Sequence, residues 1–243
     1  MRTLALLGLL SVVSLLRPET GYRNGYQHPS QISGDLIGLE CRPNLRVSAS
    51  LFAGTSSVPA VLVLVGGQGM DGSQDTRGMT DSPFWQEWSQ KTGIAVVGVK
   101  FTGDYKDSTL GSGQALLSVL EDLALHSNHP EIATAPLVLA GFSNGGYFAL
   151  TFAAQYPSRV LGFSVNKSGY AKAPMSTELL SIPGLLIKGS QEAHDGIPSV
   201  IDALTQAGQK AGAPWVEMAD WGVGHEWGDV DPLLSQWVIN LRM

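Results

Sequence analysis

The serine at position 143 stands in a pattern that can turn its hydroxyl into a nucleophile. Four apolar residues run into Gly141, and the chain then reads G-x-S-x-G, with Ser143 between Gly141 and Gly145. Helix-forming residues follow from Tyr147 to Tyr156, so the serine lies at a sharp turn between a buried strand and a buried helix. Such a turn exposes the hydroxyl beside the free N–H groups of a helix. The alternative is a glycine-rich turn with a bystander serine, and the flanking strand and helix disfavour it.

A neutral serine hydroxyl is a weak nucleophile and needs a base that accepts its proton. Among five histidines, His225 lies in a glycine-rich loop after the last predicted strand; the alternative is a loop histidine caught between two tryptophans. The base needs a carboxylate that fixes its tautomer. Two carboxylates follow the strand that ends at Lys188. Glu192 lies close to the strand end and is preferred, whereas Asp195, the second choice, can instead cap the next helix.

The same chemistry requires N–H groups that stabilise the negative oxygen of a tetrahedral intermediate. Asn144, the residue after the serine, offers one backbone N–H. The loop after the apolar run at 60–65 offers the second, and Gln68 is the preferred donor because glycines on both sides let the backbone approach a substrate. We therefore expect an oxyanion hole from Gln68 and Asn144. The alternative for Gly66-Gly67-Gln68-Gly69 is an ordinary strand-ending turn.

The elements that position these residues follow from the hydrophobic pattern. From residue 59 onward apolar runs alternate with helical patterns, which predicts parallel strands joined by helices. We expect an α/β protein with a mostly parallel, eight-stranded sheet, helices on both faces and no large lid. The expected strands are 35–41, 45–53, 60–65, 94–100, the run before Gly141, 160–165, 183–188 and 215–219. Parallel order brings Gln68, Ser143, Glu192 and His225 to one edge of the sheet.

Details of three segments can also be predicted. Residues 70–81 are polar and predict a long loop. Ser82 followed by Pro83 is typical of a helix start, and Trp85 and Trp88 on that helix are expected in the core. Asp231 before a proline is expected to cap the final helix.

The composition narrows the class of function. The chain has 243 residues and a net charge of −6 with no basic run, which argues against nucleic acid as a partner. Cys41 is the single cysteine, so the chain has neither an internal disulfide nor a cysteine-based metal cluster. His126 and His129 have a spacing that can hold a metal, but no third ligand accompanies them.

The N-terminus predicts export. Arg2 is followed by an apolar run from Leu4 to Leu16, which matches a signal peptide and is short for a membrane span. We expect residues 1–24 to hold the signal peptide and the start of a connecting arm, and residues 25–243 to form a single domain. The alternative for the first 16 residues is a helix packed on the domain.

Three motifs together resemble those of the α/β-hydrolase superfamily: Gly141-Phe142-Ser143-Asn144-Gly145-Gly146, Gly189-Ser190-Gln191-Glu192 and Gly222-Val223-Gly224-His225. The likeness covers roughly residues 45–243 and is strongest to lidless esterases related to polyhydroxybutyrate depolymerases, feruloyl esterases and dienelactone hydrolases. Those families usually have aspartate in place of Glu192, and often histidine-glycine in place of Gly66-Gly67.

The resemblance and the residues imply the same activity. We expect an exported serine hydrolase that cleaves small or polymeric carboxylic esters through an acyl-enzyme, without a cofactor or metal. A peptidase or an acyltransferase would use the same residues, and a non-catalytic binding protein would share the fold. The motifs leave the acyl group, the alcohol and the oligomeric state open.

Overall fold

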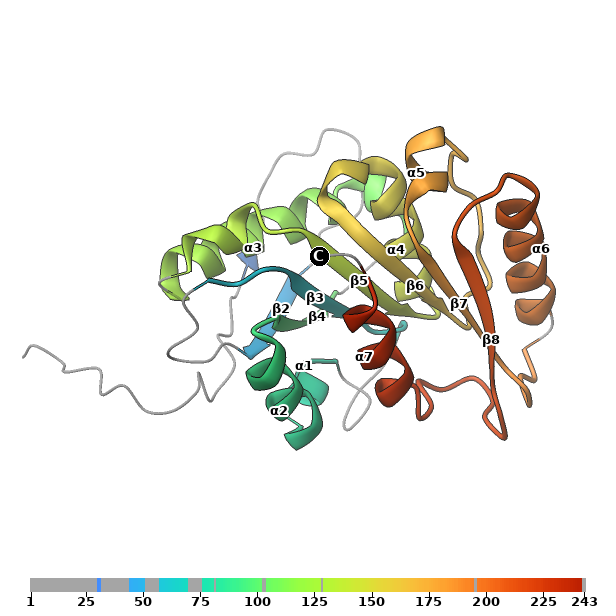
Figure 1. Cartoon of the computed structure of the whole chain (residues 1–243), viewed down its shortest axis with the longest axis horizontal. Helices are drawn as coiled ribbons and strands as arrows, with labels where there is room; N and C mark the ends of the chain where they lie inside the picture. Colours follow the sequence, from blue (N-terminus) through green and yellow to red (C-terminus); the bar gives the residue numbers. More distant parts are fainter. Residues whose placement is uncertain are drawn as a thin grey trace, which may run out of the picture.

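A single mixed sheet forms the centre of the molecule (Figure 1). The computed structural model describes residues 30–31, 44–50, 57–69, 76–80, 82–101, 104–127, 129–194 and 196–241. Within them the strand order is β1-β2-β4-β3-β5-β6-β7-β8. The strands are β1 Ser30–Gln31, β2 Asn44–Ser50, β3 Val61–Val65, β4 Ala95–Lys100, β5 Leu137–Phe142, β6 Val160–Asn166, β7 Gly184–Gly189 and β8 Trp215–Asp220.

Six of these strands, β3 to β8, are parallel to one another. Strand β2 joins them antiparallel to β4, and the two-residue β1 pairs antiparallel with β2. The α/β class and the mostly parallel sheet are therefore confirmed. The strand expected at 35–41 lies outside the described residues, as do the expected signal peptide and the arm before residue 30.

Helices cover both faces of the sheet: α1 Thr76–Thr80, α2 Pro83–Thr92, α3 Ser112–Ser127, α4 Asn144–Gln155, α5 Thr177–Ser181, α6 Ile197–Lys210 and α7 Asp231–Ile239. Alternate residues of each strand point to opposite faces. Val61, Val63 and Val65 belong to the buried cluster that also contains residues of α3, α4, α5 and α6, whereas Leu62 and Leu64 belong to the cluster that contains residues of α2 and α7. Both faces are thus buried, which explains why β3 is apolar at every position.

Helix α1 corrects one prediction, because it lies inside the stretch 70–81 that was expected to be a loop. Its first residue, Thr76, is buried, and its hydroxyl donates a hydrogen bond of 2.7 Å to the carbonyl oxygen of Val99. A tertiary contact to β4 therefore stabilises a turn of helix that the polar sequence does not predict.

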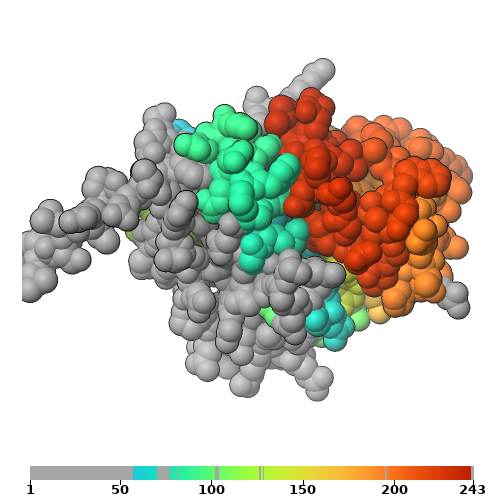
Figure 2. Space-filling view, turned by 90° about the horizontal axis from the view of Figure 1, so that it is seen from below, coloured from blue at the N-terminus to red at the C-terminus, as the bar shows by residue number. Residues whose placement is uncertain are grey.

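The N-terminus of α7 corrects another prediction. Asp231 is the first helical residue, so Val230 and not Asp231 occupies the cap position. Its carboxylate instead accepts from the indole N–H of Trp85, at 3.0 Å, and of Trp227, at 2.9 Å. Burial raises the pKa of Asp231 above its usual value. The bond between Trp85 and Asp231 joins α2 to the C-terminal segment, and Figure 2 shows the two segments side by side on the surface.

The start of α2 follows the prediction. Ser82 caps it, and its hydroxyl accepts from the N–H of Trp85 at 3.4 Å. Trp85 and Trp88 are both buried, as expected for core residues.

Candidate active site

Ser143 lies on a strained turn between β5 and α4. Its backbone has φ 54° and ψ −119°, a left-handed conformation that is costly for a residue with a side chain. Glycines make the turn possible: a Cβ on Gly141 would lie 1.9 Å from the carbonyl oxygen of Gly145, and a Cβ on Gly145 would lie 2.2 Å from that of Val65. The Ser143 N–H donates to the carbonyl of Asn166 at 2.8 Å, which ties the turn to β6.

His225 connects the serine to a carboxylate. Its Nε2 lies 3.1 Å from Ser143 Oγ, and its Nδ1 lies 2.8 Å from Glu192 Oε2. An ionised carboxylate only accepts hydrogen bonds, so Nδ1 carries the hydrogen and Nε2 presents its lone pair to the serine hydroxyl. The three side chains come from the turn after β5, the loop after β7 and the loop after β8. The structure thus brings together the serine, acid and histidine that the sequence singled out.

Glu192 has a second imidazole partner. Its side chain is fully buried, and its Oε1 accepts from the backbone N–H of His194 at 2.9 Å and lies 3.0 Å from Nδ1 of the same residue. Burial by itself raises the pKa of Glu192, but the hydrogen bonds from His194 and His225 outweigh it and hold the pKa below its usual value. The carboxylate is therefore ionised at neutral pH. Asp195, the second choice for the acid, lies outside the described residues.

The predicted oxyanion residues also meet. The side-chain N–H of Asn144, the first residue of α4, donates to Gln68 Oε1 at 3.0 Å. Gly67 approaches the serine so closely that a Cβ there would lie 3.1 Å from Ser143 Cβ. The loop after β3 therefore runs beside the turn at Ser143, with Gly67 next to Ser143 and the Gln68 side chain on Asn144.

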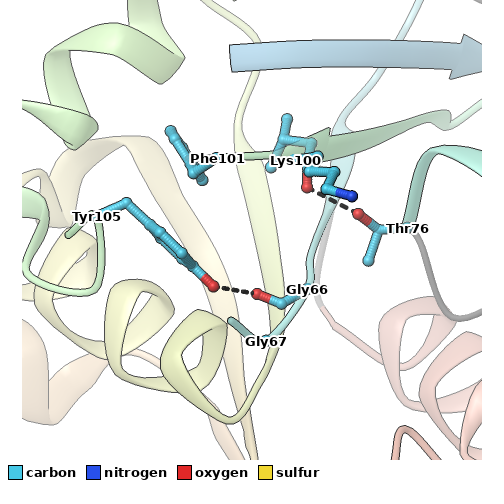
Figure 3. A pocket seen from close by; sticks show the side chains of 7 residues that line it. Gly66, Gly67, Thr76, Lys100, Phe101 and Tyr105 are labelled. Carbon is cyan, nitrogen blue, oxygen red and sulfur yellow. Dashed lines mark hydrogen bonds between the residues drawn. The ribbon is translucent and has the colours of Figure 1, made fainter. Parts of the chain in front are cut away.

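Tyr105 supports this loop through its hydroxyl (Figure 3). The hydroxyl, which points at Gly66 in Figure 3, donates to that residue's carbonyl oxygen at 2.6 Å. The ring is buried and stacks on Phe101 with 5.0 Å between ring centroids. Burial raises the pKa of Tyr105, so the hydroxyl stays protonated and remains a donor. The sequence did not predict this role, because the two residues are far apart in the chain.

A buried lysine holds the loop that carries His225. Lys167 is fully buried, follows β6 and has a positive φ of 51°. Its Nζ donates to Asp220 Oδ2 at 2.7 Å and to the carbonyl oxygen of Glu226 at 3.0 Å. Asp220 ends β8 and Glu226 follows His225, so one ammonium joins both ends of the loop. The only sequence signal for this residue is a lone cation directly after an apolar strand.

Comparisons with known proteins show the same architecture. No protein-family model matches the chain, and no curated protein matches it in sequence. Solved structures do match. A thermostable esterase superposes with a TM-score of 0.62 and 13% identity over 80% of this chain, which spans 58% of the esterase. A thermostable esterase from Pseudomonas putida superposes with a TM-score of 0.57 and 13% identity over 86% of each chain. A dienelactone hydrolase from Anabaena variabilis superposes with a TM-score of 0.58 and 18% identity, over 90% of this chain and 99% of the hydrolase.

The chain has the α/β-hydrolase fold. This confirms the fold that the three motifs predicted. In this α/β-hydrolase fold Ser143, Glu192 and His225 follow β5, β7 and β8, and the connection between β6 and β7 contains only the short helix α5. No helix in the described part of the chain is long and apolar enough to span a membrane.

Proposed function

We propose that this protein is a serine-dependent carboxylic ester hydrolase. The observation that supports the proposal is the unbroken hydrogen-bond chain from Ser143 Oγ through His225 to Glu192, with distances of 3.1 and 2.8 Å. A strained turn presents the serine, and the tautomer of the histidine leaves Nε2 free to accept a proton. This arrangement matches what nucleophilic catalysis by a serine requires.

In the proposed reaction Ser143 Oγ attacks the ester carbonyl while its proton moves to His225 Nε2. Glu192 stabilises the imidazolium that forms, through the Nδ1–H bond. The imidazolium then protonates the leaving alcohol and an acyl-enzyme remains. Water attacks the acyl-enzyme by the same proton transfers in reverse order, which releases the acid and regenerates the serine. All of these steps use side chains of the chain itself.

The backbone N–H groups of Asn144 and Gln68 form the proposed oxyanion hole. Asn144 opens α4, where free N–H groups and the positive end of the helix favour a negative oxygen. The bond between the Asn144 and Gln68 side chains keeps the two residues adjacent. Removing one such donor typically lowers turnover by about 10²–10³.

Small or polymeric esters are the proposed substrates, and the structural neighbours named as esterases support this choice. A peptidase, an acyltransferase and a binding protein without turnover remain the competing functions. A fluorophosphonate probe separates the binding protein from the others, because only an activated serine is labelled. Nitrophenyl esters of graded acyl length then measure hydrolysis and acyl preference.

Variants connect both readouts to the proposed residues. Ser143→Ala should abolish labelling, and Ser143→Ala and His225→Ala should each lower turnover by about 10⁴–10⁶ with the circular dichroism spectrum unchanged. Ser181→Ala, at an exposed serine of α5, is the matched control and should label fully. A Ser143→Ala protein that kept a tenth of wild-type turnover would overturn the assignment.

The acid is tested by a pair of variants. Glu192→Gln should lower turnover by roughly 10⁴, because the imidazole then loses the partner that fixes its tautomer. Asp195→Asn should leave turnover nearly intact. Inactivity of the second variant together with activity of the first would make Asp195 the acid.

We further propose that the protein is exported. Arg2 and the apolar run from Leu4 to Leu16 support this. Mass spectrometry of the protein from its native host should find a chain that lacks roughly the first 16–24 residues. Soluble cytoplasmic protein with an intact N-terminus would refute it.

A further inference from the structure

Glu192, His194 and His225 form a cluster that exceeds what the proposed ester hydrolysis needs. One ligand atom from each residue can be chosen so that all three lie within 4.8 Å of one another. The two imidazole rings lie side by side, with 4.3 Å between their centroids and a tilt of 51° between their planes. Hydrolysis by serine uses one imidazole and one carboxylate, so His194 carries no proton in the mechanism and serves only as a hydrogen-bond donor to Glu192.

Two imidazole nitrogens and a carboxylate oxygen are a ligand set typical of zinc sites that keep an open coordination position. The bonds to Zn²⁺ would be about 2.0–2.2 Å, so the three ligand atoms, now within 4.8 Å of one another, must rearrange to lie about 3.3 Å apart. The side chain of His194 is 64% exposed and can make this movement, whereas that of Glu192 is fully buried. A metal ion would therefore enter from the His194 side.

We propose that Glu192, His194 and His225 bind a divalent transition metal such as Zn²⁺, and that this binding switches the enzyme off. The metal would occupy Nδ1 of both histidines and an oxygen of Glu192, in place of the two N–H···O contacts that now join them. Each neutral imidazole keeps its single hydrogen, which moves from Nδ1 to Nε2.

The change of tautomer explains the inhibition. In the metal-free arrangement His225 Nε2 offers a lone pair to the Ser143 hydroxyl at 3.1 Å. With the metal on Nδ1, Nε2 carries the hydrogen and can no longer accept the serine proton. The nucleophile loses its base even where the ring stays in position. This half of the inference rests on the proposed function, whereas metal binding itself does not.

Isothermal titration calorimetry with Zn²⁺ tests binding without substrate. Ser143→Ala protein, which keeps all three ligands, should bind one Zn²⁺ per chain. The further change His194→Ala should weaken that affinity at least about tenfold, a loss that even an outer-shell partner can cause. His129→Ala is the matched control, because His129 and Glu131 also form a pair two residues apart, at 2.9 Å, and no third ligand joins them among the described residues. That variant should bind as tightly as its parent.

Hydrolysis of a nitrophenyl ester tests the switch in the wild-type protein. Zn²⁺ should inhibit turnover, a chelator should restore it, and His194→Ala should raise the inhibitory concentration by the same factor as it weakens binding. Equal Zn²⁺ affinity with and without His194, or no binding at all, would overturn the site. Binding without inhibition in an active enzyme would overturn the switch. Absent turnover with intact binding would instead refute the proposed function and leave the site standing.

Discussion

Removing the charge of Lys167 should loosen the loop that carries His225. The ammonium is fully buried and bonds both Asp220, before the histidine, and the carbonyl of Glu226, after it. Lys167→Met keeps the apolar stem and the positive φ, so the variant tests the ammonium alone. Asp220, with a side chain only 11% exposed, would be left without its cation. Breaking a buried ion pair from one side costs about 3–5 kcal/mol, and we expect a loss near the lower end because water reaches Asp220.

Turnover should fall as well, because His225, the proposed base, would lose its fixed distance to Ser143. A displacement of about 1 Å at a reacting group can cost about 10²-fold in rate. Urea unfolding followed by circular dichroism measures the first effect, and initial rates on a nitrophenyl ester measure the second. The double variant Lys167→Met, Asp220→Asn leaves no unpaired charge, so its loss of stability should be smaller than the sum of the single losses by about 1 kcal/mol or more.

Lys188 supplies the matched control. It also contacts two carboxylates, Asp202 at 2.6 Å and Glu217 at 2.5 Å, but its side chain is 29% exposed and these partners lie on α6 and β8, not in the loop that carries His225. Lys188→Met should therefore cost at most about 1 kcal/mol and leave turnover unchanged. If Lys167→Met were as stable and as active as Lys188→Met, the buried ammonium would have no part in holding the loop.

Three other predictions concern the loop after β3, the nucleophile turn and the surface. Tyr105→Phe removes the hydrogen bond to Gly66 and should cost about 1 kcal/mol of stability and lower kcat more than it changes KM; a change confined to KM would contradict this. Gly145→Ala forces a Cβ against a carbonyl of β3 and should lower the melting temperature and the yield of folded protein, which a thermal melt measures. Hydrogen bonds from His129 and from backbone N–H groups hold the pKa of Glu131 below its usual value. The stability that these bonds give is fully present above the pKa of Glu131 in the unfolded chain, about 4.3. It is lost as the pH falls through the lower pKa of Glu131 in the folded protein. Urea unfolding at a series of pH values should show that the free energy of unfolding falls less steeply at acid pH for Glu131→Gln than for the wild type.

The sequence predicts best the features that depend on neighbouring residues. The turn at Ser143 is defined by glycines two residues to either side, and a strand and a helix frame it directly. The parallel strands can also be predicted, because burial on both faces makes an element such as β3 apolar throughout. Their parallel order then brings Ser143 and His225 to one edge without any knowledge of the distances.

Contacts between distant residues limit what the sequence predicts. Asp231 looks like a helix cap because aspartate before proline is typical there, yet its partner Trp85 lies 146 residues away in the chain. Thr76 begins a helix in a polar stretch because the carbonyl of Val99 is there to accept its hydroxyl. In both cases a tertiary hydrogen bond outweighs a weak local preference.

The position of Glu192 could be predicted from the sequence, but the reason for its longer side chain comes from tertiary contacts. Its position after the end of β7 predicts that a carboxylate lies near the sheet edge, but the esterase families that the motifs resemble usually have aspartate there. The structure supplies a reason for the longer side chain: one oxygen of Glu192 reaches His225, while the other accepts from His194, two residues further along. In a carboxylate whose side chain has no solvent exposure, both sets of donors favour the ionised form. His194 therefore stabilises the charge that orients His225, and the same geometry makes it the third ligand of the proposed metal site.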